Sequence, residues 1–169
     1  DGARMAYGLA SPAADLSLNE IAALCDVFYI GGTKCGALFG EAVVTRRPEL
    51  LPRFASLVKL HGAMLAKGRL LGVQFSTLFT NGLYERIGKH AVKMAMKLKD
   101  GFKAKGYPLF VDSPTNQQFF IMPNEKIDSL KKIASFELWG PKGDTHTPVR
   151  FVTDWATTEE EIDMLIHNA

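Results

Sequence analysis

Lys34 is the residue of this chain whose surroundings most favour covalent chemistry. It follows a β-branched and aromatic stretch, Val27–Ile30, and stands among glycines in the segment C-D-V-F-Y-I-G-G-T-K-C-G-A-L-F-G, residues 25–40. Glycine lets other backbone approach closely, and an amine shielded from water is more readily the neutral nucleophile that forms an imine. On this pattern alone, a solvated loop lysine is the more common alternative.

Two arginines have the chemistry to bind a carboxylate. Arg4 ends the opening tetrapeptide D-G-A-R, and Arg150 lies within T-P-V-R-F-V-T, residues 147–153. A planar guanidinium can donate to both oxygens of a carboxylate at once. The alternative for Arg150 is an edge-strand charge that faces water.

The order of three motifs carries a family resemblance. D-G-A-R, then G-G-T-K at residues 31–34, then T-P-V-R-F-V-T is similar to the threonine-aldolase branch of the β-eliminating lyases. These are pyridoxal-phosphate enzymes of the aspartate-aminotransferase fold, and the resemblance covers essentially the whole chain as the C-terminal half of such an enzyme. It implies an α/β fold, in which residues 1–82 are the C-terminal part of a fold type I large domain and residues 83–169 are a small α+β C-terminal domain.

The resemblance also implies roles for individual residues. Lys34 would hold pyridoxal 5'-phosphate as a Schiff base, and Asp1 would pair with the pyridine nitrogen, where a carboxylate keeps the ring protonated and able to accept electrons. Arg4 and Arg150 would bind the carboxylate of the substrate. Thr33 would bind the cofactor phosphate, although a loop threonine can instead satisfy local backbone.

Arg69 has a further implied role at the phosphate. The tripeptide Lys67-Gly68-Arg69 lies where related enzymes carry a basic residue that reaches a phosphate, often across a dimer interface. Exposed helix charge is the alternative for Arg69, and a terminal acid without function is the alternative for Asp1.

These roles imply a lyase that cleaves the Cα–Cβ bond of a β-hydroxy amino acid, taking L-threonine or L-allo-threonine to glycine and acetaldehyde. Another pyridoxal-phosphate β-eliminating lyase, a class V aminotransferase relative and a non-catalytic fragment of such an enzyme remain as alternatives. The implied partners are a small amino-acid substrate and further copies of the protein, as a homodimer or homotetramer.

Two departures from the family pattern limit these expectations. Thr153-Asp154-Trp155 stands where some threonine aldolases have a histidine, which leaves the substrate preference open. The cofactor-stacking histidine, the main phosphate loop and the candidate base of the family would all precede Asp1. We therefore expect the 169 residues to contain only part of a catalytic site.

Composition favours a folded chain outside the membrane. Apolar residues make up 47% and charged residues 22%, with a formal net charge of +2, which is ordinary for a protein with a buried core and gives little support to nucleic-acid binding. No apolar run reaches membrane-spanning length. Two cysteines without a C-x-x-C motif suit a reducing compartment, so a cytoplasmic location is expected. The histidines show no ligand spacing, so no metal site is expected.

In the first half of the chain, Ser17 and Glu20 have capping-box spacing and predict a helix over 18–24. A strand over 27–30 and the loop with Lys34 follow. A hairpin is predicted next, with strands 37–39 and 42–45 flanking Gly40-Glu41. Helices are then predicted over 48–60, with Pro52 as a point where the beginning of the helix can bend, and over 67–79.

The second half begins with the most regular helix, which follows Thr80-Asn81-Gly82 and ends before Gly106. Its apolar face is Ile87, Ala91, Met94, Ala95, Leu98 and Phe102. Strands are predicted over 109–111, 118–122, 136–139 and 149–152, a helix capped by Asn124 over 125–134, and a last helix after Thr157 and Thr158. Short strands interleaved with helices indicate a small α+β domain.

Overall fold

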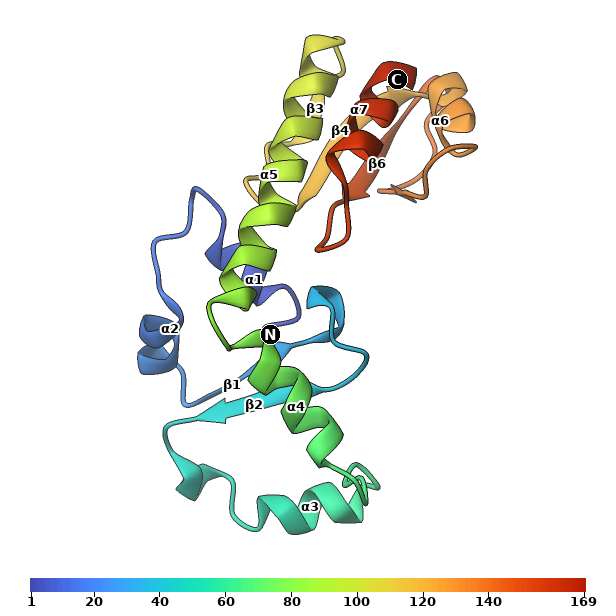
Figure 1. The fold of residues 1–169 in the computed structure, drawn as a ribbon. Helices are drawn as coiled ribbons and strands as arrows, with labels where there is room; N and C mark the ends of the chain where they lie inside the picture. The colour runs from blue at the N-terminus through green and yellow to red at the C-terminus, as the bar shows by residue number, and fades with distance from the viewer.

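The computed structural model describes all 169 residues, which form two connected parts (Figure 1). The N-terminal region, residues 1–82, contains a two-stranded sheet, and the C-terminal region, residues 83–169, contains a four-stranded sheet. Helix α5, Leu83–Ala104, runs from the first part along the second. None of the helices combines the length and the hydropathy that crossing a bilayer requires.

The N-terminal region is built from short elements around one antiparallel strand pair. In chain order these are α1 (Met5–Leu9), α2 (Leu18–Leu24), β1 (Val27–Gly31), the 3-10 turn η1 (Thr33–Cys35), β2 (Glu41–Thr45), η2 (Pro48–Leu50), α3 (Phe54–Leu60) and α4 (Arg69–Leu78). Helix α2 has the predicted bounds because Ser17 and Glu20 form the reciprocal capping box. Helix α1 was not predicted.

Two predictions for this region are wrong. Residues 37–39 form no strand, because β2 pairs antiparallel with β1 instead, with Phe28 opposite Val44, and this pairing lets β1 bury Phe28 and Ile30. The helix predicted over 48–60 is divided into η2 and α3. Pro52 lies between the two pieces and cannot donate a helical hydrogen bond, so it interrupts the helix.

The C-terminal region packs helices against an antiparallel sheet of order β3-β4-β6-β5. Its elements after α5 are β3 (Leu109–Val111), β4 (Gln117–Pro123), α6 (Asn124–Leu130), β5 (Glu137–Leu138), β6 (His146–Val152) and α7 (Glu159–Asn168). Thr158 and Glu161 form the capping box of α7. The prediction that Asn124 caps α6 is wrong, because its side-chain amide donates to the carbonyls of Gly143 and Asp144, at 3.0 and 3.1 Å.

Helix α5 contributes to two separate hydrophobic clusters. Its first turns bury Tyr84, Ala91 and Val92 with residues of the N-terminal region, and its later turns pack on the sheet of the C-terminal region. The later cluster consists of Met94, Leu98, Phe102, Phe120, Met122, Ile127, Leu130, Val149, Phe151, Ile162 and Leu165. The division into domains at residue 82 remains a proposal, since α5 belongs to both cores.

Candidate active site

Lys34 lies on a tight turn between β1 and β2, as the sequence predicted. The amides of Cys35 and Ala37 both donate to the Gly32 carbonyl, at 2.9 and 3.0 Å. Gly36 ends the turn with a φ of +92°, a left-handed conformation that glycine adopts without strain. The expectation of an amine shielded from water is wrong for this chain, because the Lys34 side chain is exposed.

The opening residues lie directly on β1, which brings D-G-A-R beside the lysine turn. The Gly31 amide donates to the Gly2 carbonyl at 3.0 Å. A Cβ on Gly2 would lie 1.8 Å from the Tyr29 carbonyl oxygen, and one on Gly31 would lie 2.8 Å from the Cα of Ala3. Both glycines are therefore required by the close approach of two backbone segments.

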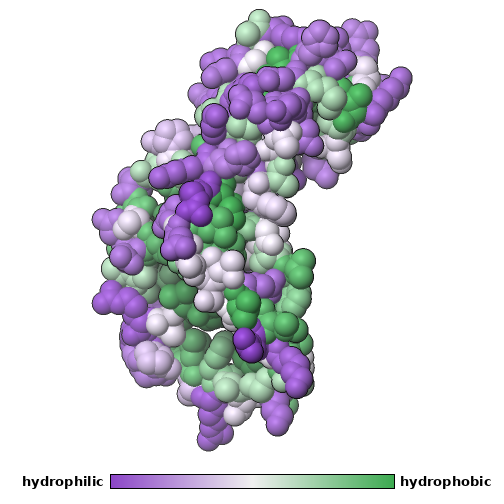
Figure 2. Space-filling view, viewed as in Figure 1, coloured by the Kyte–Doolittle hydropathy of each residue, from purple (hydrophilic) through white to green (hydrophobic).

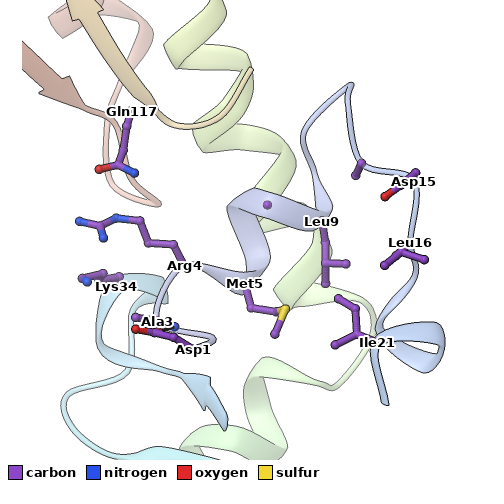
Figure 3. A pocket seen from close by; sticks show the side chains of 12 residues that line it. Asp1, Ala3, Arg4, Met5, Leu9, Asp15, Leu16, Ile21, Lys34 and Gln117 are labelled. Carbon is purple, nitrogen blue, oxygen red and sulfur yellow. Dashed lines mark hydrogen bonds between the residues drawn. The ribbon is translucent and has the colours of Figure 1, made fainter. Parts of the chain in front are cut away.

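Asp1, Arg4 and Lys34 line one cavity of about 560 Å³ together with Gln117. In Figure 3 the side chains of Arg4 and Lys34 extend in the same direction, and the amide of Gln117 faces them from β4. The Asp1 carboxylate accepts a hydrogen bond from the Ala3 amide at 2.9 Å. The apolar side of the cavity is formed by α1 and the segment that leads to α2.

Arg150 does not line this cavity and is joined to it through Gln117. Its Nη1 donates to Oε1 of Gln117 at 3.3 Å, and its Cζ lies 4.6 Å from the centre of the Trp139 ring. The Nε atoms of both Arg4 and Arg150 are buried without a hydrogen-bond partner. A buried donor that lacks an acceptor costs about 1–3 kcal/mol, so each of these two Nε atoms is an unsatisfied donor that an acceptor would stabilise.

Two further predicted residues lie away from the cavity lining. Thr33 is exposed on the turn and is not among the residues that line the cavity. Arg69 lines a different, largely apolar cavity of about 830 Å³ with Leu38, Phe39 and the start of α4. Within one copy of the chain, Arg69 and Lys34 line different cavities. The contacts of Thr33 and Arg69 with the cofactor phosphate therefore stay predictions.

Sequence reasoning missed Gln117 and Tyr7. Gln117 occupies the first position of β4, next to Gln118, and the alternation of side chains along a strand could have separated an outward Gln117 from the fully buried Gln118. Tyr7 lies on α1 and donates its hydroxyl hydrogen bond to the carbonyl of Lys34. Burial raises the pKa of the Tyr7 phenol and of the Cys35 thiol, so neither is suited to act as a base or nucleophile near neutral pH.

A comparison with solved structures finds proteins whose chains superpose on this one. Threonine aldolase from Leishmania major is 42% identical in sequence and superposes with a TM-score of 0.94, over 99% of this chain. By sequence and by fold, the chain is related to the threonine aldolases. It spans 49% of the Leishmania chain, and the family resemblance carried by the D-G-A-R, G-G-T-K and T-P-V-R-F-V-T motifs is confirmed.

Serine palmitoyltransferase from Sphingomonas wittichii has the same fold at much lower sequence similarity. It is 12% identical over 86% of this chain, with a TM-score of 0.59, and 39% of its own length is covered. The expected α/β fold, as the C-terminal portion of a fold type I enzyme, is thereby confirmed. Comparisons with protein-family models and with curated proteins gave no match.

Proposed function

We propose that the chain is the C-terminal part of a pyridoxal-phosphate lyase that cleaves the Cα–Cβ bond of a β-hydroxy amino acid, such as L-threonine. The observation that carries this proposal is the shared cavity, where Asp1, Arg4 and Lys34 meet in a chain related to the threonine aldolases. Each side chain matches one functional group of the cofactor or of an amino acid.

The side chains of the cavity fit pyridoxal phosphate at its aldehyde and at its ring nitrogen. The exposed Lys34 amine can link covalently to the aldehyde. The Asp1 carboxylate has one oxygen on the Ala3 amide, and it can pair with a protonated pyridine nitrogen. Once bound, the cofactor draws electrons from the bonds of the amino acid's α-carbon. Contacts to the phosphate are proposed for Thr33 and Arg69, the latter from a second copy of the protein.

The arginines would choose which bond is cleaved. Arg4 and Arg150 each carry a buried Nε without an acceptor, and a substrate carboxylate would supply one. A carboxylate held by guanidinium groups would fix the rotation of the substrate about its α-carbon, and this would determine which of the α-carbon bonds is cleaved. Gln117 holds Nη1 of Arg150, which leaves Nε and Nη2 for the carboxylate.

The covalent role of Lys34 can be tested by reductive trapping. The chain is incubated with pyridoxal phosphate and borohydride, and the modified lysines are identified by peptide mass spectrometry. We expect label at Lys34 well above the other lysines, and its loss in Lys34→Ala. Lys142→Ala, which removes another exposed loop lysine, is the control and should leave the Lys34 label intact. Preferential label at another lysine would contradict the proposal.

Product analysis addresses the reaction itself. The protein is given L-threonine and L-allo-threonine, and acetaldehyde and glycine are measured, since release of ammonia and a keto acid would instead indicate β-elimination. We expect the 169 residues alone to release acetaldehyde far more slowly than a complete threonine aldolase, because they span about half of such an enzyme. A homodimer or homotetramer and a cytoplasmic location are part of the same proposal.

A further inference from the structure

A buried tyrosine lies directly beneath the lysine turn. Tyr7 is 1% exposed, and its hydroxyl donates to the backbone carbonyl of Lys34. Cys35, the next residue of the turn, is fully buried in the same hydrophobic cluster as Tyr7. The hydrogen bond from Tyr7 thus reaches the turn at the residue whose side chain lines the cavity.

Helix α1 holds this phenol in a fixed place. Its N-cap is Arg4, and the Tyr7 amide donates to the Arg4 carbonyl at 3.1 Å, so the two side chains project from the same short helix. The helix lies against α5 at Gly88, where a Cβ would come within 2.3 Å of the Ala6 carbonyl oxygen. Such close packing leaves α1 little freedom to move.

A side chain of the C-terminal region also lies against the turn. A Cβ on Gly36 would lie 3.5 Å from the Trp155 ring. The turn is therefore contacted by Tyr7 from the N-terminal region and by Trp155 from the C-terminal region. Only the Tyr7 contact is a hydrogen bond to Lys34 itself.

We propose that Tyr7 is a positioning residue for Lys34: its hydroxyl fixes the backbone of the turn and, through it, the direction in which the Lys34 amine enters the cavity beside Arg4. The use of that amine for a cofactor rests on the proposed function. A phenol is suited to this role because it reaches from a rigid helix with only two side-chain torsions to order. Tyr7→Phe keeps the ring and removes only the donor.

Tyr84 provides the matched control. It is 3% exposed in the same hydrophobic cluster, and its hydroxyl makes no hydrogen bond to Lys34. Tyr84→Phe therefore removes a hydroxyl from a similar environment while leaving the hydrogen bond to the Lys34 carbonyl in place. Any general effect of removing a buried phenol hydroxyl would appear in both Tyr7→Phe and Tyr84→Phe.

The first measurement is amide hydrogen exchange in the 169-residue chain without cofactor. The amides of Cys35 and Ala37 are reporters of the turn, because both donate to the Gly32 carbonyl. In Tyr7→Phe their exchange should accelerate about tenfold, the factor that follows from losing one buried hydrogen bond of about 1.4 kcal/mol. Amides in the middle of α5 should be unchanged, and Tyr84→Phe should match the unmodified chain.

The second measurement is the initial rate of reductive labelling of Lys34 by pyridoxal phosphate. In Tyr7→Phe this rate should fall by a smaller factor than the one seen in exchange. Exchange follows the small population with an open turn, whereas labelling follows the larger population in which the ordered turn presents the amine. Unchanged exchange at Cys35 and Ala37, or an equal acceleration across α5, would overturn the proposal. A selective exchange effect with no Lys34 label in any variant would support the positioning of the turn and refute the cofactor role.

Discussion

The N-terminal and C-terminal regions of the molecule differ in how fully their helices bury apolar side chains. In the C-terminal region, the fully buried Phe102 ring lies 4.9 to 5.5 Å from the rings of Tyr107, Phe120 and Phe151. In the N-terminal region, α3 buries no residue and α4 buries only Leu78. Figure 2 shows the same contrast, with apolar side chains exposed over the N-terminal part and a mostly hydrophilic C-terminal part.

Lys34 belongs to the region with the smaller core, and Arg150 to the region with the larger one. The lysine turn is fixed by individual close contacts, namely the Gly2–Gly31 backbone approach and the Tyr7 hydrogen bond. Arg150 lies on β6, which pairs with both β4 and β5. We therefore expect the N-terminal region to open more readily than the C-terminal region, since local stability follows buried contacts.

The largest change in stability is expected from a substitution in the C-terminal core. Phe102→Ala should lower the free energy of unfolding by about 3–5 kcal/mol, because it leaves a cavity among three other aromatic rings. Urea denaturation followed by the fluorescence of Trp139 and Trp155 reports on this region. Leu57→Ala, on the half-exposed face of α3, is the comparison and should cost less than about 0.5 kcal/mol. A similar loss of unfolding free energy in both variants would show that the two regions do not differ in how much their buried side chains stabilise the fold.

A smaller and more local effect is expected at the contact between D-G-A-R and β1. Gly2→Ala should destabilise the N-terminal region by about 1–3 kcal/mol, because the new methyl group would overlap the Tyr29 carbonyl. The rate at which a thiol reagent reaches the buried Cys35 measures this opening. Gly8→Ala is the control: nothing lies within 4 Å of its Cβ, and alanine in a helix should slightly stabilise α1. Equal labelling rates in the two variants would show that the close approach is not required.

The smallest effect is a pH dependence confined to the C-terminal region. Hydrogen bonding to Lys97, with the nearby charge of Lys93, lowers the pKa of Glu159 at the start of α7. A lowered folded-state pKa gives stability that is present above the ordinary carboxyl pKa and is lost as pH falls through the lowered value. Lys97→Met should therefore flatten the acid side of the stability profile, measured by thermal unfolding between neutral and acid pH. An unchanged profile would show that this exposed ion pair contributes nothing measurable.

The sequence alone predicted elements whose signals are local. The capping boxes of α2 and α7 need only residues three positions apart, and the apolar face of α5 repeats over many turns. The turn at Lys34 follows from a β-branched strand that ends in glycines. The order of the D-G-A-R, G-G-T-K and T-P-V-R-F-V-T motifs was enough to predict the family, because family membership depends on the linear sequence.

Tertiary structure decided what local patterns could not. A helix as short as α1 is not stable alone, and it forms here because Gly88 lets it pack closely on α5. The partner of β2 was decided by the burial of Phe28 and Ile30, which a local hairpin would have left exposed. The link from Arg150 through Gln117 to the cavity joins residues that are distant in sequence. Such contacts depend on which surfaces pack together, and the sequence by itself gives no local signal of that choice.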